Sequence, residues 1–333
     1  MAKGNKKSPH KKLIAGIGSA LVDILLQETD EFLLASGAAK GGMTLIDSSA
    51  FIDTTLGKTI AQTSVVPGGS ACNTILGIGK LGGKARFIGK RGNDDLGALL
   101  ESTLKEHNVD PRLFVSESPT GRVLSIVTPD AQRSMFTFLG ASAETKPEEM
   151  LTSHFEDAAL VHLEGYLLFN EQLLLAALKA AKHHNALISL DLASYTVVEA
   201  ARHILPEIIH DYVDIVIANE DEARAFTGFN DEDKALQALA QAADIAILKV
   251  GKRGSMVSHY NSITRIERMG SGAAVDTTGA GDLWAAGFLY GYINDYPIDH
   301  CGRIASACGY EVCQVLGAQI PDDGWKRIKS LLQ

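Results

Sequence analysis

The spacing of hydrophobic positions along this chain changes near its midpoint. From about residue 158 onward, short apolar runs alternate with longer segments in which apolar residues recur every three to four positions. The short runs are typical of buried strands, and the periodic segments are typical of amphipathic helices. The expected strands are 160–163, 187–190, 214–218 and 245–250, and the expected helices are 171–183, 220–226, 231–242, about 281–293 and about 299–316. This alternation predicts an α/β fold in which helices cover both faces of a mostly parallel central sheet.

The first half of the chain has a less regular pattern. It contains an expected strand at 13–18, a periodic helical segment at 70–81 and a short expected strand at 85–89. Residues 22–66 consist of short apolar stretches, glycines and polar turns, and residues 122–140 place two apolar stretches around a turn-like Pro-Asp-Ala-Gln segment. We expect the second of these regions to form a β-hairpin. Residues about 22–66 and 118–141 are therefore expected to form a small β-rich lid.

Composition narrows the class of protein. The chain has 333 residues, of which 46% are hydrophobic, and it can bury the core of one large domain with an accessory lobe. No repeat or low-complexity linker divides it, so we expect a single domain over 13–333 with the lid as an insertion. Residues 1–12 carry five lysines without a signal-peptide pattern, and we expect a disordered basic tail there.

The net charge and the cysteines of the chain indicate which binding partners and which cellular compartment to expect. A formal net charge of −9 argues against a general nucleic-acid surface. No apolar run reaches the roughly 18 residues that span a bilayer, so no membrane partner is expected. The cysteines form no Cys-x-x-Cys pair, and we expect them to be reduced, buried and unreactive in a cytoplasmic protein. They are Cys72, Cys301, Cys308 and Cys313.

The segment Asp276–Tyr292 combines a glycine turn with the start of an apolar helix. Gly279 and Gly281 let the backbone approach a ligand closely, and the free N–H groups at the helix N-terminus favour an anion such as phosphate. Asp282 lies beside those groups, where it can accept the proton of an attacking hydroxyl. The pattern indicates a phosphotransferase centre, although a tight turn with a helix N-cap explains these three residues equally well.

The segment Pro67–Asn73 places two glycines and a serine at a helix start. Asn73 offers donors and acceptors that suit sugar hydroxyls, whereas a helix cap with a flexible entry is the structural alternative. Two other glycine segments, 16–18 and 77–82, resemble dinucleotide loops, but the first lacks a third glycine and the second falls inside an expected helix. The sequence has no Walker-type phosphate loop and no protein-kinase His-Arg-Asp set, so those phosphoryl-transfer designs do not apply.

Two of these segments resemble the signatures of one known family. Residues 276–282, with the helix of small and aromatic residues after them, resemble the C-terminal signature of the PfkB carbohydrate kinase, or ribokinase, family. Residues 67–73, 81–89 and 93–97 resemble its N-terminal signature, and the resemblance covers essentially the whole chain after the basic tail. It implies a ribokinase-like three-layer sandwich and ATP-dependent phosphoryl transfer to a CH₂OH acceptor, with Asp282 as the general base.

The resemblance also implies roles for nucleotide-binding residues. Asn219 and Glu222 match the Asn-x-x-Glu motif that positions Mg²⁺ and phosphate, largely through water, whereas an acidic first helical turn is the structural alternative. Residues 249–255 resemble a turn near the ATP base and phosphates, although Lys249 replaces the threonine common in relatives and a plain hairpin is the alternative. The expected ATP-binding residues are Asn219, Gly251, Gly254, Thr277, Gly279 and Gly281, and the expected catalytic centre is Gly279, Ala280, Gly281 and Asp282.

Within the family, residues 132–141 and 164–168 look most like those of adenosine kinases. Tyr166 either stacks on a purine or packs in the core, and Arg133 is expected to neutralise phosphate charge when the lid closes. Asp23 either accepts hydrogen bonds from a sugar diol or is a solvated turn residue, and Ser19 stands where adenosine kinases often carry asparagine. The expected acceptor-binding residues are Ser19, Asp23, Gly68, Gly69, Ser70, Asn73, Arg133 and Tyr166.

The preferred acceptor is therefore an adenosine-like nucleoside, phosphorylated at its 5′-hydroxyl by ATP with Mg²⁺. A sugar kinase acting on ribose or a ketohexose is the alternative within the family. A non-catalytic nucleoside or sugar sensor and an NAD-dependent dehydrogenase are alternatives from other classes. An aspartate at a helix N-terminus should have a low pKa, so Asp282 is expected to accept the proton only late in the transfer. A requirement for K⁺ and the choice between monomer and homodimer are left open.

Overall fold

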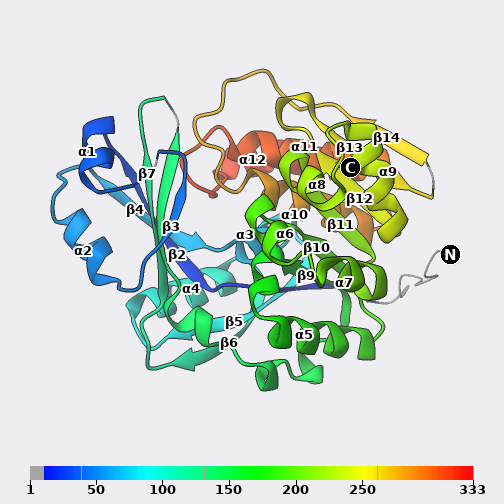
Figure 1. Cartoon of the computed structure of the whole chain (residues 1–333), viewed down its shortest axis with the longest axis horizontal. Coiled ribbons are helices and arrows are strands. Elements are labelled where there is room, and N and C mark those ends of the chain that lie inside the picture. The colour runs from blue at the N-terminus through cyan, green and yellow to red at the C-terminus, as the bar shows by residue number, and fades with distance from the viewer. Residues whose placement is uncertain (1–10, 39, 131, 261, 333) are drawn as a thin grey trace.

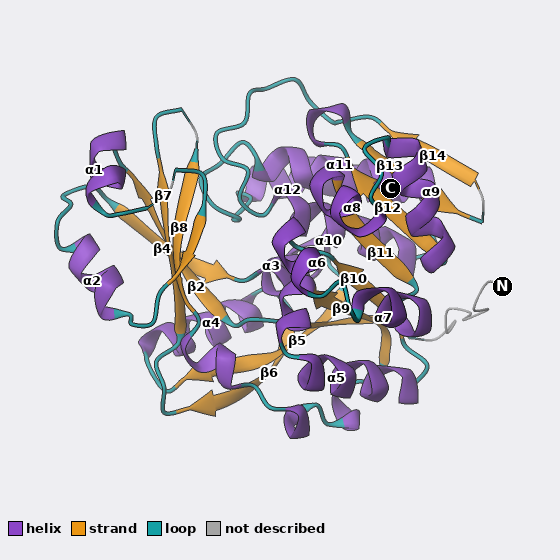
Figure 2. Ribbon diagram, viewed as in Figure 1, coloured by secondary structure: helices purple, strands orange, loops and turns teal. Residues whose placement is uncertain are grey.

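The computed structural model describes residues 11–38, 40–130, 132–260 and 262–332, and within them a nine-stranded sheet is the largest element. Its strand order is β14-β13-β12-β11-β10-β9-β1-β5-β6 (Figures 1 and 2). Neighbouring strands are parallel from β6 to β12, and β13 and β14 extend the sheet antiparallel at one edge. The strands are β1 (Leu13–Ile17), β5 (Lys84–Gly92), β6 (Val109–Ser116), β9 (Ala158–Glu164), β10 (Leu187–Asp191), β11 (Ile215–Asn219), β12 (Ile245–Lys249), β13 (Ser255–His259) and β14 (Ser262–Ile266).

Helices cover both faces of this sheet because successive strand residues point to opposite sides. In β11, Ile215 and Ile217 belong to one hydrophobic cluster, and Val216 and Ala218 belong to the other. This confirms the predicted α/β sandwich with a mostly parallel sheet. The first face is covered by α3 (Ser70–Leu81), α4 (Asp95–Glu106), α10 (Ala280–Ile293), α11 (Ile298–Val312) and α12 (Asp322–Lys329). The second is covered by α5 (Glu171–His183), α6 (Tyr195–Ala200), α7 (Leu205–Tyr212), α8 (Glu220–Thr227) and α9 (Glu232–Ala242).

A second, smaller sheet lies beside the large one, to its left in Figure 1. Its five strands have the order β3-β8-β7-β2-β4, and two short helices pack on it around a separate hydrophobic core. The segments that form it come from the two regions in which the sequence predicts a lid. The elements are β2 (Leu21–Gln27), α1 (Asp30–Ala35), β3 (Met43–Leu45), α2 (Ala50–Leu56), β4 (Thr63–Gly68), β7 (Gly121–Val127) and β8 (Arg133–Phe138).

Most expected elements are present, and the differences have local causes. The bounds of α3 and α5 are those predicted, and β7 and β8 form the expected hairpin. The last long helix ends at Val312 rather than 316, because the chain there turns back to contact the loop before α10. In that contact the Val275 amide donates to the Cys313 carbonyl at 2.8 Å, and the Gly317 amide donates to the Asp276 carboxylate at 2.9 Å. The sequence analysis did not predict α4, β6, α6, α7 or α12.

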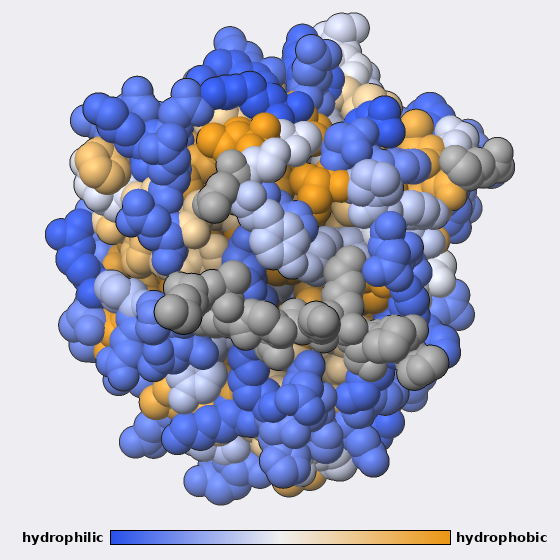
Figure 3. Space-filling model, turned by 90° about the vertical axis from the view of Figure 1, so that its right-hand side faces the viewer, coloured by the Kyte–Doolittle hydropathy of each residue, from blue (hydrophilic) through white to orange (hydrophobic). Residues whose placement is uncertain are grey.

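Two expectations about composition are also answered by the structure. Cys72, Cys301 and Cys308 are buried and form no disulfide, but Cys313 is only half-buried because it follows the end of α11, so the expectation that all four are buried is wrong. The face seen in Figure 3 is mostly hydrophilic with scattered hydrophobic side chains. Among the described residues, no helix has both the length and the apolar character that crossing a membrane requires. Most of the predicted basic tail, residues 1–10, lies outside the described residues.

Candidate active site

The turn before α10 brings backbone, rather than side chains, to the edge of a cavity. Gly279 caps α10 with a φ of 72°, in the left-handed region that favours glycine. A Cβ at this position would lie 2.6 Å from the Cβ of Ala318, so a side chain would also clash. The first amide groups of a helix lack carbonyl partners inside it, and the positive end of the helix dipole lies at the same place. Residues 277–281, which we call the anion loop, therefore form a cradle suited to an anion.

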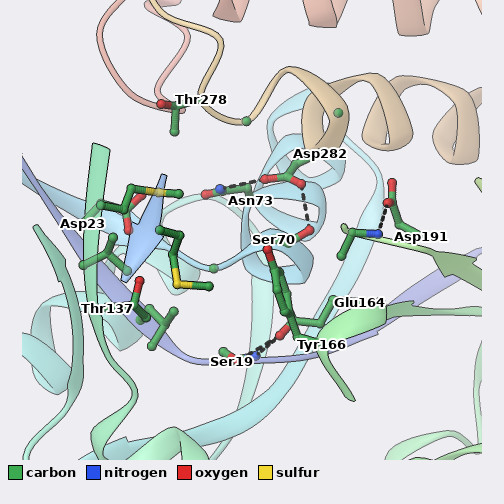
Figure 4. Close-up of a pocket in the computed structure, with 18 of the residues that line it drawn as sticks. Ser19, Asp23, Ser70, Asn73, Thr137, Glu164, Tyr166, Asp191, Thr278 and Asp282 are labelled. Carbon is green, nitrogen blue, oxygen red and sulfur yellow. Dashed lines mark hydrogen bonds between the residues drawn. The ribbon is translucent and has the colours of Figure 1, made fainter. Parts of the chain in front are cut away.

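Asp282 lies in the first turn of α10 and is held by side chains from α3 (Figure 4). Ser70 Oγ donates to Asp282 Oδ1 at 2.7 Å, and Asn73 Nδ2 donates to Asp282 Oδ2 at 3.0 Å. Burial raises the pKa of Asp282 above its usual range, although these two hydrogen bonds oppose the shift. The expected low pKa is therefore wrong, because the loss of solvent around the carboxylate outweighs the helix N-terminus. A higher pKa makes Asp282 a stronger base than the sequence analysis expected.

Polar side chains end four adjacent parallel strands on the same side of the sheet. Glu164 ends β9, Asp191 ends β10, Asn219 ends β11 and Lys249 ends β12. The register pairs Glu164 with Asp191 and Asn219 with Lys249. Ligands of open α/β sheets bind outside the carboxyl ends of the strands, and all four residues line the same cavity as Asp282.

Glu164 connects this sheet edge to the start of α3. Its carboxylate accepts from the amide and hydroxyl of Ser19, each at 2.9 Å, and from the amide of Ala71 at 3.0 Å. Burial raises the pKa of Glu164, and these hydrogen bonds oppose the shift. Because Ala71 lies between Ser70 and Asn73, Glu164 also fixes the helix turn that holds Asp282.

The small sheet contributes charged residues from the opposite side of the cavity. Asp23 in β2 is buried, and burial raises its pKa to about 7, although the Arg133 guanidinium opposes the shift. Arg133 in β8 donates to the hydroxyl of Thr278 at 2.7 Å, and that hydroxyl in turn donates to Asp276. The small sheet is therefore tied directly to the anion loop by Arg133.

Apolar side chains form a wall of the same cavity, whose volume is about 670 Å³. Met43 and Leu45 from β3 and Tyr166 and Phe169 from the turn after β9 line it while remaining 37–65% exposed. Burial raises the pKa of the Tyr166 phenol to about 12, so this ring is neutral at physiological pH. Tyr166 therefore does not simply pack in the core, and these side chains give the cavity an exposed apolar surface.

Asn219 and Glu222 form the cap of α8 and face the cavity. Glu222 accepts from the Asn219 amide at 2.8 Å and from Asn219 Nδ2 at 2.7 Å, and the Asn219 side chain accepts from the Glu222 amide at 2.9 Å. Burial and the nearby Asp191 raise the pKa of Glu222 to about 7. No group of three or more acidic, His or Cys side chains among the described residues is arranged to hold a metal ion directly. A hydrated Mg²⁺ fits here, because it keeps several waters and needs few carboxylates.

The structure brings together most, but not all, of the residues singled out from the sequence. Gly68 is not at the cavity surface but lies against Asp23, whose carboxylate oxygen would be 2.2 Å from a Cβ at 68. Gly251 and Gly254 lie in the turn between β12 and β13 and do not line the cavity. The residues predicted from the sequence that do line it are Ser19, Asp23, Gly69, Ser70, Asn73, Arg133, Tyr166, Asn219, Glu222, Thr277, Gly279, Ala280, Gly281 and Asp282.

The cavity residues that were not predicted as site residues include three charged residues and one threonine. Glu164, Asp191 and Lys249 end strands, and Thr278 lies within the glycine segment. The sequence did contain one signal for the first three, since each is a charged residue directly after an apolar strand-like run. Their proximity to one another depends on the strand order, which the sequence pattern did not specify.

Comparison with known proteins identifies the family. The family model described as pfkB family carbohydrate kinase matches residues 30–324. The chain belongs to this family. The kinase is 30% identical over 304 residues to probable fructokinase-5 of Arabidopsis thaliana. The alignment covers 84% of this chain and 92% of the relative. It is 28% identical over 271 residues to a nucleoside kinase of Methanocaldococcus jannaschii, covering 80% and 85% of the two chains.

A solved structure gives the same fold. The kinase superposes on the crystal structure of adenosine kinase from Sinorhizobium meliloti with a TM-score of 0.88 and 31% identity, over 97% of this chain and all of that chain. The ribokinase-like fold and the kinase class inferred from the sequence are therefore confirmed. Because its relatives include both sugar and nucleoside kinases, family membership leaves the acceptor to be argued from the cavity.

Proposed function

We propose that this kinase transfers the γ-phosphoryl group of ATP to the 5′-hydroxyl of an adenosine-like nucleoside. The observation that carries the proposal is the composition of the cavity, whose lining combines a buried base and an anion loop with an apolar wall. Asp282 and residues 277–281 form the first part, and Tyr166, Phe169 and Met43 belong to the second. A nucleoside supplies both a hydroxyl for the base and a flat ring system for the apolar wall.

In the proposed mechanism, Asp282 takes the proton of the acceptor hydroxyl as its oxygen bonds to the phosphorus. Ser70 and Asn73 hold the carboxylate in place through the hydrogen bonds described above. The amide groups of Gly279 and Gly281 in the anion loop stabilise the charge on the phosphoryl group in transfer, whereas those of Thr278 and Ala280 already donate to Asp276 and to the Thr277 carbonyl. The small sheet acts as a lid that excludes water, with Arg133 at the contact to the loop.

Glu222 and Asn219 are proposed to orient a hydrated magnesium ion. When bound, Mg²⁺ neutralises charge on the ATP phosphate oxygens. The cavity is lined by the acidic residues Asp23, Glu164, Asp191, Glu222 and Asp282, whereas Arg133 and Lys249 are the basic residues among the lining residues. This excess of negative charge favours a cation at the site. Glu222 is already held by Asn219, and therefore acts through water.

The apolar wall favours a nucleoside over a small sugar. A sugar of five or six carbons would leave Met43, Leu45 and Phe169 facing water, whereas a nucleobase buries their apolar surface at about 25 cal/mol per Å². Asp23 and Ser19 are placed to accept or donate hydrogen bonds with the ribose hydroxyls. The similarity to fructokinases supports a ketohexose as the alternative acceptor. Cytoplasmic localisation and the oligomeric state stay predictions.

The test measures ADP release with Mg-ATP over a panel of nucleosides and sugars, with and without K⁺, for wild type and Asp282→Asn. We expect turnover with adenosine or a close analogue, and a loss of at least about 100-fold in Asp282→Asn, because general-base help is typically 10²- to 10⁴-fold. Turnover with a sugar alone would overturn the nucleoside assignment and keep the kinase. Ligand binding without turnover on any acceptor would favour a sensor.

A further inference from the structure

The side chain of Lys249 reaches from the end of β12 to the anion loop. A Cβ built on Gly281 would lie 3.0 Å from Lys249 Nζ and 4.0 Å from Lys249 Cε, and apart from the adjoining residues and the backbone of α10 no other atom of the described residues would lie within 4 Å. The ammonium group is therefore the nearest group to the position that a side chain at residue 281 would occupy. The glycine leaves the space between the loop and the ammonium open to the cavity that both residues line.

A buried carboxylate holds this ammonium in place. Lys249 Nζ donates to Asp191 Oδ2 at 2.8 Å, and the two side chains are only 16% and 7% exposed. Burial by itself lowers the pKa of Lys249, but the carboxylates of Asp191 and Glu222 outweigh it and keep the pKa above its usual range. The lysine is thus a fixed positive charge at neutral pH. Asp191 is also anchored from its other side, because its Oδ1 accepts from the Ala193 amide at 2.9 Å.

We propose that Lys249 is a catalytic residue that binds the phosphoryl group during its transfer. The proposal rests on the function proposed above. In the step, the acceptor oxygen forms a bond to the γ-phosphorus of ATP while the bond from that phosphorus to the ADP oxygen breaks, and Asp282 receives the acceptor proton. The Lys249 ammonium keeps its protons and donates hydrogen bonds to the non-bridging oxygens, together with the neighbouring amide group of Gly281.

A structural role for the same ion pair makes a different prediction. A buried ion pair that only supports the fold can be replaced by neutral residues with little loss, because desolvation offsets most of its attraction. The double variant Lys249→Met/Asp191→Asn removes both charges together and leaves neither one buried and unpaired. The matched control is Lys182→Met/Asp214→Asn, since Lys182 and Asp214 form a similar pair at 2.7 Å that does not line the cavity.

The first readout requires no acceptor. The dissociation constants of ADP and of a non-hydrolysable ATP analogue are measured by calorimetry for wild type and both double variants. For Lys249→Met/Asp191→Asn we expect about 10-fold weaker binding of the analogue, the scale of one lost charged hydrogen bond, with ADP binding unchanged because ADP lacks the group that is transferred. The control should match wild type for both ligands. Equal loss for ADP and the analogue would overturn the phosphoryl contact.

The second readout is kcat with the best acceptor of the panel. We expect kcat of Lys249→Met/Asp191→Asn to fall by about 100-fold or more, as when one donor to a developing charge is removed. A kcat within threefold of wild type would contradict the proposal. If this variant does not fold, Lys249→Gln gives the same comparison, because its amide can still donate to Asp191. If wild type turns over no acceptor, the proposed function fails, while the ratio of the two dissociation constants still decides the role of Lys249.

Discussion

At the scale of single residues, the site is defined by carboxylates that lack solvent. Asp23, Glu164, Glu222 and Asp282 all have pKa values raised chiefly by burial. Ionising any of these carboxylates in the folded protein therefore costs free energy, unless a bound ligand or cation stabilises the charged form. We interpret this cost as stability that the fold gives up in order to keep a base and binding groups at the cavity.

The raised pKa of Asp23 predicts how stability depends on pH. Its pKa is about 7 in the folded protein and 3.8 in an aspartate exposed to solvent, as in the unfolded chain, so the folded form binds the extra proton and the stabilisation is present at low pH. This stabilisation is lost as pH rises from about 4 through 7, and it amounts to a few kcal/mol, since each pKa unit is worth about 1.4 kcal/mol. Asp23→Asn should flatten this part of the pH profile. The measurement is the free energy of unfolding in urea at several pH values.

The control is Asp211→Asn, which changes an exposed aspartate on α7. Its profile between pH 4 and 7 should follow that of wild type. If the free energy of unfolding of Asp23→Asn changes with pH in this range as it does in wild type, Asp23 is not the group whose protonation is linked to folding.

At the scale of elements, the start of α10 decides the geometry of the anion loop. Gly279→Ala would force a side chain into the left-handed region and against Ala318. We expect it to cost about 2–4 kcal/mol in unfolding free energy, as the sum of backbone strain and overpacking, and to lower kcat by displacing the loop amides. Thermal and urea unfolding check the first effect, and the ADP-release assay checks the second.

Gly228→Ala is a matched control for that prediction. Gly228 caps the end of α8 with a φ of 77°, but nothing lies within 4 Å of a Cβ built there. Gly228→Ala should lower the free energy of unfolding by about 1 kcal/mol through backbone strain alone, and it should keep wild-type activity. Equal losses in the two variants would mean that the contact with Ala318 does not constrain the anion loop.

At the scale of the whole molecule, the small sheet has its own core and is tied to the anion loop by Arg133 and Thr278. Thr278→Val removes the hydroxyl that accepts from Arg133 while keeping the volume of the side chain. We expect amide hydrogen exchange in β7 and β8 to become several-fold faster, because the small sheet loses a contact to the rest of the protein. Exchange in β9–β11 should not change. Mass spectrometry with peptide resolution provides the measurement.

A control on the small sheet itself separates docking from internal stability. Arg122 and Asp53 form an ion pair at 2.8 Å between β7 and α2, with Asp53 59% exposed. Asp53→Asn should change exchange in the small sheet less than Thr278→Val does, since exposed ion pairs contribute about 0–1 kcal/mol. A larger change in exchange for Asp53→Asn than for Thr278→Val would show that Arg133 and Thr278 do not hold the small sheet against the loop.

The sequence by itself determined the elements and one half of the site. The bounds of α3 and α5 follow from local apolar periodicity, and the anion loop follows from Gly279 and Gly281 before an apolar helix, because these signals depend on neighbours in the chain. Short elements such as α6 and α7 were missed because their few turns give little periodicity, and they are stabilised by packing on the large sheet.

Only the tertiary structure decided the rest of the site. The pKa of Asp282 depends on burial under α3, and the pairing of Lys249 with Asp191 depends on strands 58 residues apart ending at the same sheet edge. The apolar wall likewise combines β3 with the turn after β9. These are long-range contacts and solvent exclusion, which no local pattern encodes. The sequence therefore predicted where the proposed phosphoryl transfer takes place, and the fold decided which charges meet there and which side chains line the cavity.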